Sequence, residues 1–386
     1  MVTAIGEAGA PRRFVALDSW RGIAALGVVF FHIVADRGLP TLRWHDSLGL
    51  CVDFFFVLSG FVIASAYGDR LAAGYPLGRF VWLRLGRIWP LHASVLAILV
   101  VVECGIGAMG WLHNGREAFT GTHDVAGLAW TLLLLQAFTR PGEAGWNVQS
   151  WSISVELALY LIAAVGFRRL GRGAAWLGLA AALVALAAGQ WAAATVWPYY
   201  WLQRGVAGFG LGMASWALWP RIAPWIAACD ERRATIAEAA AIAGVVLVLA
   251  TDAPLIVADP LFMGLVLLFA AERGALAGAL HRRPFVTLGA LSYGLYMVHG
   301  MVLSRCFDAL EAVERSTGAR LTGTTAYGSA KLVTPAWATD FLVLAMLGAS
   351  LGIAWLAHRW IEAPARAWSR EMVADDGAAS AFAQPA

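Results

Sequence analysis

The sequence has little charge, almost no lysine and no long polar stretch. Only 14% of its 386 residues are charged and 60% are hydrophobic, whereas a soluble domain carries about 25% charged residues. Lys331 is the only lysine, so arginine carries nearly all of the positive charge. The largest gap between apolar runs, residues 307–338, is too short for an independent soluble domain. We therefore expect any site to lie within or at the rim of the apolar part.

Cysteine is also scarce, and its spacing excludes the usual cysteine-based sites. Cys51, Cys104, Cys229 and Cys306 are scattered, without CxxC spacing or a neighbouring set of histidines. This pattern predicts neither a zinc site nor a disulfide framework. We expect no metal and no permanently bound cofactor. The arginines cluster in short loops, which indicates membrane orientation and not nucleic-acid binding.

Apolar runs of about 17 to 25 residues recur along the whole chain. Each is long enough to cross roughly 30 Å of hydrocarbon as an α-helix. The sequence therefore predicts an all-α fold, a polytopic transmembrane helical bundle of about ten spans in contact with the lipid bilayer. The predicted spans are 20–36, 48–67, 88–110, 152–166, 174–195, 204–219, 234–251, 254–271, 286–306 and 339–358.

The distribution of arginine predicts the orientation of these spans. With a cytoplasmic N-terminus, ten spans place most of the 28 basic residues on one side, as the positive-inside rule requires. We expect a bacterial inner-membrane protein with both termini cytoplasmic. Residues 1–13 would form a cytoplasmic segment, 14–368 the transmembrane domain and 369–386 a disordered cytoplasmic tail.

One shorter apolar piece, residues 126–138, does not fit the set of spans. At about 13 residues it is too short to span the bilayer comfortably. Counting it as a crossing would also move Arg168, Arg169 and Arg172 to the outside. We predict a re-entrant or interfacial helix on the outer face.

Four glycines imitate a nucleotide-binding fingerprint. Gly205, Gly208, Gly210 and Gly212 lie inside an apolar run, and no predicted strand precedes them. Small residues at such spacing let two helices approach closely. The sequence predicts helix packing here.

Arg21 and His32 are the first candidate pair. Ionisable groups inside spans are expensive and are functional candidates by default. Eleven helical steps bring the two side chains to within roughly 20° of one direction, and Asp18 is placed to pair with Arg21. His32 could act as a general base, and Arg21 could hold an anionic donor such as a phosphate. A structural histidine and a snorkelling arginine are the alternative.

Two further sets of polar residues share helix faces. Ser152, Glu156 and Tyr160 repeat at four-residue intervals, and Ser292, Tyr296 and His299 are spaced four and three apart. Glu156 could orient a histidine or bind an acceptor hydroxyl, unless it is only a carboxylate favoured by the helix dipole. Tyr296 and His299 could line an acceptor channel, and a packing role for His299 is an equal alternative.

Three charged residues complete the candidates. Asp53 would be expensive in lipid, so it should face a polar cavity or a basic partner. Arg84 and Arg87 form a basic pair on the predicted cytoplasmic side. That pair suits a phosphate, or it serves only the positive-inside rule.

Taken together, six segments resemble acyltransferase family 3, the bacterial integral-membrane O-acyltransferases that modify surface glycans and other hydroxylated acceptors. The resemblance runs from about residue 14 to 368, in the order of the family's motifs, and the ten-span topology agrees with that of the family. The segments are Leu17-Asp18 through Arg21 and His32, Phe54 to Gly60, Arg84 to His92, Trp151 to Glu156, Ser292 to His299, and Glu362-Ala363-Pro364.

The resemblance implies a cytoplasmic acyl-CoA co-substrate, commonly acetyl-CoA, and transfer to a hydroxyl of a glycan or other acceptor. Arg21 and His32 match the family's essential pair, and Arg84 and Arg87 match its arginine motif, which would bind the coenzyme A phosphates. Asp53, Ser152, Tyr296 and His299 are the expected substrate-binding residues, with Glu156 catalytic. After Glu156 this chain has Leu157 where the family often has a second acid. We expect no fused esterase-like domain, so any handover of the acyl group would occur within the membrane unit.

Two other classes remain open at this stage. A proton-coupled transporter or flippase of a glycan or lipid-linked precursor would use the same buried groups, but the repeated halves and broken helices typical of transporters are not evident. A polyprenyl-linked glycosyltransferase would carry a paired acidic motif in an outer loop. Asp36 and Asp46 do not form one.

Overall fold

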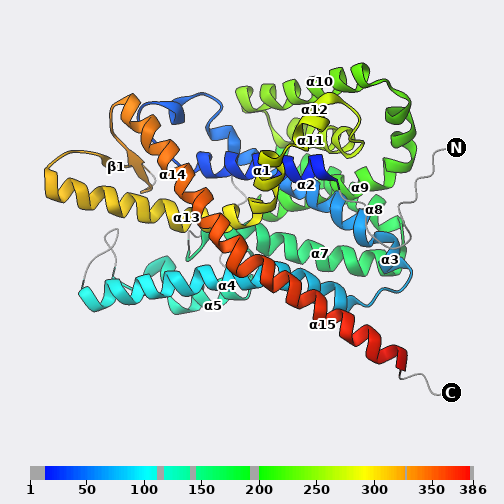
Figure 1. Ribbon diagram of the computed structural model, residues 1–386, viewed down its shortest axis with the longest axis horizontal. Helices are drawn as coiled ribbons and strands as arrows, with labels where there is room; N and C mark the ends of the chain where they lie inside the picture. Colours follow the sequence, from blue (N-terminus) through cyan, green and yellow to red (C-terminus); the bar gives the residue numbers. More distant parts are fainter. Residues whose placement is uncertain (1–13, 111–116, 140–144, 192–199, 327, 383–386) are drawn as a thin grey trace. The chain divides into compact units, whose positions relative to one another are not determined.

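Helices dominate the computed structural model, which describes residues 14–110, 117–139, 145–191, 200–326 and 328–382 (Figure 1). The α-helices are α1 Val15–Phe31, α2 Cys51–Ile63, α3 Asp69–Ala72, α4 Leu77–Met109, α5 Val125–Leu132, α6 Gln136–Thr139, α7 Trp151–Leu170, α8 Gly173–Trp191, α9 Tyr200–Ala228, α10 Glu231–Thr251, α11 Leu255–Ala270, α12 Ala275–Leu280, α13 Arg283–Thr317, α14 Ala336–Ala357 and α15 Ala363–Phe382. The 3₁₀ and π segments are η1 Leu39–Thr41, η2 Asp46–Leu50, η3 Ala64–Gly68, η4 Gly121–His123, η5 Val148–Ser150 and η6 His358–Glu362. The strands are β1 Thr322–Thr324 and β2 Ala330–Leu332.

Each of the ten predicted spans coincides with a helix, although the boundaries differ. Six continuous helical segments of the described chain are long and apolar enough to cross a membrane, and two shorter apolar helices accompany them. The helical membrane fold is therefore confirmed, and the number of about ten crossings stays a prediction. The six are Asp46–Ala72, Leu77–Met109, Val148–Leu170, Glu231–Thr251, Arg283–Thr317 and Ala336–Val373; the shorter two are Gly173–Gly189 and Leu255–Ala270.

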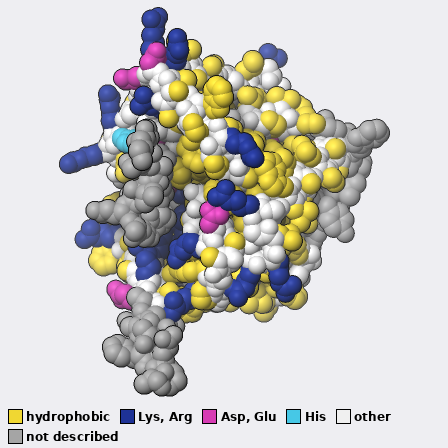
Figure 2. Space-filling view, turned by 90° about the vertical axis from the view of Figure 1, so that its right-hand side faces the viewer, with side chains coloured by type: hydrophobic (Ala, Val, Ile, Leu, Met, Phe, Trp, Pro, Cys, Tyr) yellow, Lys and Arg dark blue, Asp and Glu magenta, His cyan; other side chains and the backbone are white. Residues whose placement is uncertain are grey.

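Large apolar side chains lie on the surface of these helices. Val101 of α4, Val184 of α8 and Leu247 of α10 are all more than half exposed. Figure 2 shows hydrophobic side chains over much of the visible face, with Lys and Arg side chains more prominent than Asp and Glu. Apolar exposure on this scale would promote aggregation in water and is the normal surface in lipid.

The first predicted span is displaced along the chain. We predicted a helix over 20–36, but α1 begins at Val15 and ends at Phe31. Beyond His32 the backbone leaves the helix and pairs with β2, because the Asp36 amide donates to the Leu332 carbonyl at 3.0 Å. His32 therefore lies in the turn that follows α1.

The segment 126–138 forms two short helices, α5 and α6. The Asp124 carboxylate accepts a hydrogen bond from the Gly127 amide at 2.6 Å and so caps the start of α5. Leu134, between the two helices, has a positive φ of 57°. At 1.5 Å per residue the eight residues of α5 extend only about 12 Å. Neither helix can cross the bilayer alone, and the location of the segment relative to the membrane stays a prediction.

Two details differ from the predicted all-α bundle with a disordered tail. The gap 307–338 contains an antiparallel hairpin, in which Thr322 pairs with Leu332 and Thr324 with Ala330. Gly328, with a positive φ of 80°, lies in its loop. The segment from residue 369 is also helical as far as Phe382, because α14 continues through η6 into α15 and carries the helix onward (Figure 1). Residues 1–13 and 383–386 lie outside the described part.

The described chain divides into two compact units. Unit 1 comprises Met1–Gly27, Asp46–Tyr75 and Ala158–Ala290, and unit 2 comprises Val28–His45, Pro76–Leu157 and Leu291–Ala386. Helices α1, α7 and α13 each contribute residues to both units.

Close packing of α2, α8 and α9 forms the core of unit 1. A Cβ on Gly212 would overlap the backbone of Val57 and Phe61 in α2, and a Cβ on Gly210 would overlap Gly178 in α8. Gly208 likewise packs against Phe56. Gly208, Gly210 and Gly212 therefore serve helix packing as predicted, since no larger side chain fits between these backbones.

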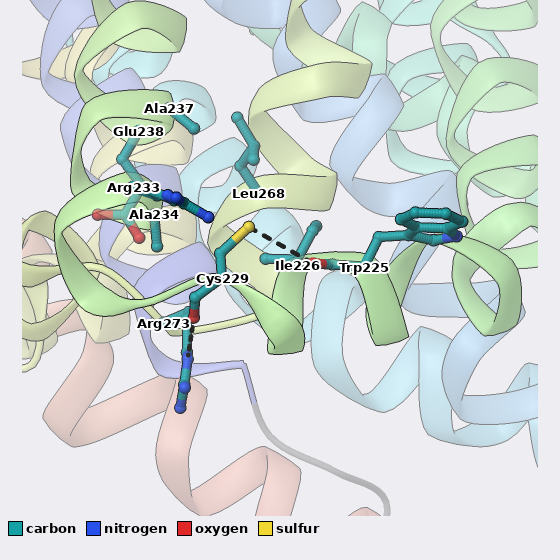
Figure 3. A pocket seen from close by; sticks show the side chains of 9 residues that line it. All are labelled: Trp225, Ile226, Cys229, Arg233, Ala234, Ala237, Glu238, Leu268 and Arg273. Atoms are coloured by element: carbon teal, nitrogen blue, oxygen red, sulfur yellow. Dashed lines mark hydrogen bonds between the residues drawn. The ribbon is translucent and has the colours of Figure 1, made fainter.

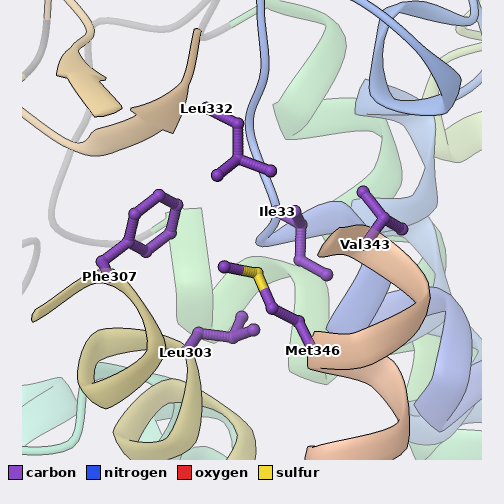
Figure 4. Close-up of a cluster of buried hydrophobic side chains, with 6 residues drawn as sticks. All are labelled: Ile33, Leu303, Phe307, Leu332, Val343 and Met346. Atoms are coloured by element: carbon purple, nitrogen blue, oxygen red, sulfur yellow. The ribbon is translucent and has the colours of Figure 1, made fainter. Parts of the chain in front are cut away.

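A cluster of buried side chains organises unit 2 next to His32. Ile33 lies at its centre, where the chain leaves α1 (Figure 4). The cluster joins the end of α1 to α13, α14 and β2, so the position of His32 is fixed by packing on both sides of the turn. Its members are Ile33, Leu303, Phe307, Leu332, Val343 and Met346.

Candidate active site

His32 and His299 lie against each other in unit 2. Their ring centroids are 4.9 Å apart, with the planes tilted by 55°. Leu303, one turn after His299 on α13, packs in the same cluster as Ile33. The two histidines belong to separate predicted spans, and the tertiary structure brings them into contact.

The hydrogen bonds of the two rings define which nitrogens remain basic. The Nδ1 of His32 lies 2.8 Å from the Val28 carbonyl oxygen, and the Nδ1 of His299 lies 3.2 Å from that of Leu295. A carbonyl oxygen only accepts, so we assign the ring proton of each neutral imidazole to Nδ1, which leaves Nε2 as an acceptor. The Nε2 of His299 is buried and has no hydrogen-bond partner among the described residues. Such an atom is stable only when a donor, such as a hydroxyl, reaches it.

A short row of hydroxyls continues from this pair. The Tyr296 hydroxyl lies 2.6 Å from the Ser152 Oγ and donates to the Gln149 carbonyl at 3.0 Å. The Tyr296 ring is 5.8 Å from that of His299, centroid to centroid. Ser152, Tyr296, His299 and His32 thus form one continuous polar row built from α7, α13 and the turn after α1.

Tyr293 stands at the centre of a second group that the sequence analysis missed. Its hydroxyl donates to the Ile88 carbonyl of α4 at 2.5 Å. It also lies within electrostatic reach of Arg87, Glu156 and Glu362. Tyr293 thereby connects four of the six motif segments: its own and those that contain Arg87, Glu156 and Glu362. Helical spacing within any one segment could not indicate that these four segments meet.

Glu362 is the anchor of this second group. It is 1% exposed and lies in the π-helical segment η6. His358 Nδ1 contacts one of its carboxylate oxygens at 3.1 Å, and Arg366 donates to the other. The spacing of His358, Glu362 and Arg366, four residues each, was the signal in the sequence. A buried carboxylate paired on both sides keeps this junction rigid.

The arginine motif lies within α4 and not in a loop before a span. α4 begins at Leu77, so Arg84 and Arg87 extend from helical backbone. The Arg84 guanidinium is 5.9 Å from the ring of Phe80, one turn earlier. Arg87 is directed to the Tyr293 group. The pair therefore has fixed backbone positions from which to hold an anion.

In unit 1, Arg21 and Asp53 each have an opposite charge as partner. Arg21 pairs with Asp18 at 3.2 Å, as its spacing predicted. Asp53 is fully buried and receives two hydrogen bonds from Arg204, at 2.9 and 2.6 Å. This confirms the expectation that Asp53 has a basic partner. Asp259 of α11 lies within electrostatic reach of this pair.

One pocket of unit 1 contains none of the predicted site residues. It encloses about 160 Å³ between α9, α10 and α11, and Figure 3 shows Arg233 and Arg273 at its wall beside Cys229. The Arg273 Nε donates to the Cys229 carbonyl at 3.2 Å. Neither this pocket nor any other part of the described chain contains a group of three or more His, Cys, Asp or Glu side chains that could hold a metal ion.

Fold and site together define a helical membrane protein with a pair of contacting histidines, of which His299 is buried. Comparison with known proteins identifies the family: the model of an acyltransferase domain family matches residues 14–359. The chain belongs to acyltransferase family 3. No solved structure matches it.

Two curated relatives add detail about the family. The chain is 43% identical over 90 residues to "Protein 2 in picA locus" of Rhizobium radiobacter, a match that covers 23% of this chain and 45% of that protein. It is 32% identical over 170 residues to "Acyltransferase MdmB" of Streptomyces mycarofaciens, which covers 41% of each chain. The matches thus span less than half the length of these relatives.

Proposed function

We propose that this protein is a membrane O-acyltransferase that moves an acyl group, acetyl in the simplest case, from acyl-CoA to a hydroxyl of a glycan or other hydroxylated acceptor. The observation that carries the proposal is the His32–His299 pair, with both Nδ1 atoms bound to backbone carbonyls. Both Nε2 atoms are then available to a hydroxyl.

In the proposed reaction the acceptor hydroxyl donates to His32 Nε2. His32 takes the proton as the hydroxyl oxygen attacks the thioester carbonyl carbon, and a tetrahedral intermediate forms. The carbon–sulfur bond then breaks, and the imidazolium returns the proton to the coenzyme A thiolate. An acyl-His32 intermediate is the second route, and it would release coenzyme A before the acceptor binds.

The remaining predicted residues are assigned supporting roles. Arg84 and Arg87 of unit 2 hold phosphates of acyl-CoA, which enters from the cytoplasm. Arg21 of unit 1 is assigned separately to an anionic group of the donor. Glu156 and Tyr296 shape the acceptor side, together with Ser152 and His299. We further propose ten spans in a bacterial inner membrane, with both termini cytoplasmic and the segment 126–138 on the outer face.

The test measures transfer of labelled acetyl from acetyl-CoA to the glycan fraction of membranes that contain the full chain. His32→Gln should lower the transfer rate by about 10²- to 10⁴-fold, the contribution of a general base. The control is His281→Gln, which alters a histidine that is 42% exposed and pairs with Glu272; it should keep the wild-type rate. Wild-type transfer by His32→Gln would contradict the proposal.

A transporter or flippase would give a different result once the chain is purified. Purified chain in liposomes would then move a lipid-linked glycan across the bilayer and release no coenzyme A from acetyl-CoA, with or without acceptor. Release of coenzyme A before any acceptor is added would instead identify the acyl-His32 route.

A further inference from the structure

A polar cavity of about 200 Å³ lies in unit 2 beside the histidine pair. Its wall combines the end of α4, the turn before α7 and the second half of α13. The polar side chains in the wall are Glu103, His123, Asn147, Gln149, Ser304 and Arg305.

Two residues connect this cavity to the polar row of the candidate site. Gly300, which lines the cavity, directly follows His299 on α13. The side-chain amide of Gln149 packs against Gly300, where a Cβ would overlap it. The carbonyl of Gln149 accepts the hydrogen bond of Tyr296. A molecule in the cavity therefore lies one side chain away from the row that ends at His32.

The wall offers both hydrogen-bond donors and acceptors next to an aromatic face. Asn147, Gln149 and Ser304 can each donate and accept, and the Trp146 ring also lines the cavity. Trp146 is held in place because its Nε1 donates to the Asp124 carbonyl at 2.8 Å. A sugar ring presents hydroxyl groups at its edge and an apolar face of C–H bonds. The polar side chains of this wall suit the hydroxyl groups, and the Trp146 ring suits the apolar face.

The charges of the wall do not favour an anionic occupant. The wall contains one carboxylate, Glu103, and one guanidinium, Arg305, and Arg305 is paired with Asp308 at 2.8 Å. No surplus positive charge faces the cavity, so coenzyme A phosphates would not be favoured there. The Nε of Arg305 is buried without a hydrogen-bond partner among the described residues, and it could donate to a neutral oxygen.

We propose that this cavity binds a neutral sugar ring of the acceptor and directs one of its hydroxyls to the histidine pair. The proposal rests on the proposed function, because it assigns the acceptor side of the same site. Gln149 and Gly300 then set acceptor specificity, because they line the part of the cavity next to His299 and so decide which hydroxyl reaches the histidine pair.

A labelling experiment tests the cavity without relying on transfer. Ser304→Cys is introduced into the full chain with Cys306→Ala, and N-ethylmaleimide modification of residue 304 is followed by mass spectrometry. A methyl glycoside of glucose, galactose or mannose at about ten times its Kd should slow this modification about tenfold. Cys104, which is exposed on α4, should react at an unchanged rate in the same sample.

A second variant needs no introduced cysteine. Gly300→Ala should push the Gln149 amide into the cavity, so the Kd of the methyl glycoside measured by calorimetry should rise about tenfold, the effect of one lost contact of about 1.4 kcal/mol. Gly348→Ala in α14, where a Cβ meets nothing within 4 Å, should leave it unchanged.

Two results would overturn the proposal. In the first, none of the three methyl glycosides protects residue 304 or binds the wild-type chain. In the second, acetyl-CoA protects residue 304 and the glycosides do not, which would assign the cavity to the donor. Either result leaves the His32→Gln transfer test intact, so failure of the cavity and failure of the proposed function are distinguishable.

Discussion

At the scale of single residues, the buried polar groups of this chain are held by partners from distant parts of the sequence. Asp53 of α2 is held by Arg204 of α9, and the Tyr293 hydroxyl of α13 by a carbonyl of α4. A buried charge that loses its partner is strongly destabilising, whereas an apolar pair of similar size often is not. Replacing one partner or both partners of the Asp53–Arg204 pair can therefore distinguish a structural role of Asp53 from the substrate-binding role predicted for it.

We expect Arg204→Met to lower the free energy of unfolding by about 3 to 5 kcal/mol, because Asp53 is then buried unpaired. The double variant Asp53→Leu/Arg204→Met should recover most of this loss and should retain acetyl transfer. Thermal unfolding in detergent, followed by circular dichroism, measures the stability. A stable double variant without transfer would support the substrate-binding role of Asp53.

The control for this experiment is an exposed pair in the same unit. Arg172 and Asp69 are 3.1 Å apart, with side chains 57% and 64% exposed. Arg172→Met should change the free energy of unfolding by less than about 1 kcal/mol, since surface ion pairs contribute little.

At the scale of elements, glycines decide which helices can pack together. α2 crosses α9 where Gly60 faces Gly212, and a Cβ at either position would overlap the opposite backbone. Backbone atoms cannot move aside as a flexible side chain can, so the contact is intolerant of even one methyl group.

Gly60→Ala should therefore destabilise the protein by about 1 to 3 kcal/mol, the usual penalty of overpacking. Gly264→Ala in α11 is the matched control, because a Cβ there meets nothing within 4 Å. It should be neutral or stabilise the helix by up to about 1 kcal/mol. Equal melting temperatures for the two variants would argue against a close contact between α2 and α9.

At the scale of the whole molecule, the number of crossings determines which ends of the helices meet the cytoplasm. Six helical segments qualify by length and composition alone, and ten are expected from the arginine distribution. Ten crossings with a cytoplasmic N-terminus would put both termini inside and the hairpin of β1 and β2 outside. Accessibility of single cysteines can distinguish these arrangements.

In a cysteine-free background, we expect a membrane-impermeant maleimide to label Ser329→Cys in intact spheroplasts and Arg282→Cys only after lysis. Thr120→Cys and Thr139→Cys flank α5 and α6 and should both be labelled from outside, because these helices are too short to cross. All four residues are exposed. Labelling of Thr120→Cys and Thr139→Cys from opposite sides would show that the segment between them crosses the membrane.

The sequence by itself determined the helical membrane fold, the family and most of the candidate residues. The length of hydrophobic runs and the order of the six motifs are read along the chain, so neither requires knowledge of how the helices pack. Helical spacing also predicted the Asp18–Arg21 pair and the packing role of Gly208, Gly210 and Gly212 correctly.

The tertiary structure alone decided which of these residues meet. It placed His32 against His299, joined Ser152 to Tyr296 and gathered four motif segments around Tyr293. It also ended α1 at Phe31, where pairing with β2 replaces the helical hydrogen bonds. Contacts between residues far apart in the chain depend on how helices cross, and periodicity within one helix carries no information about that crossing.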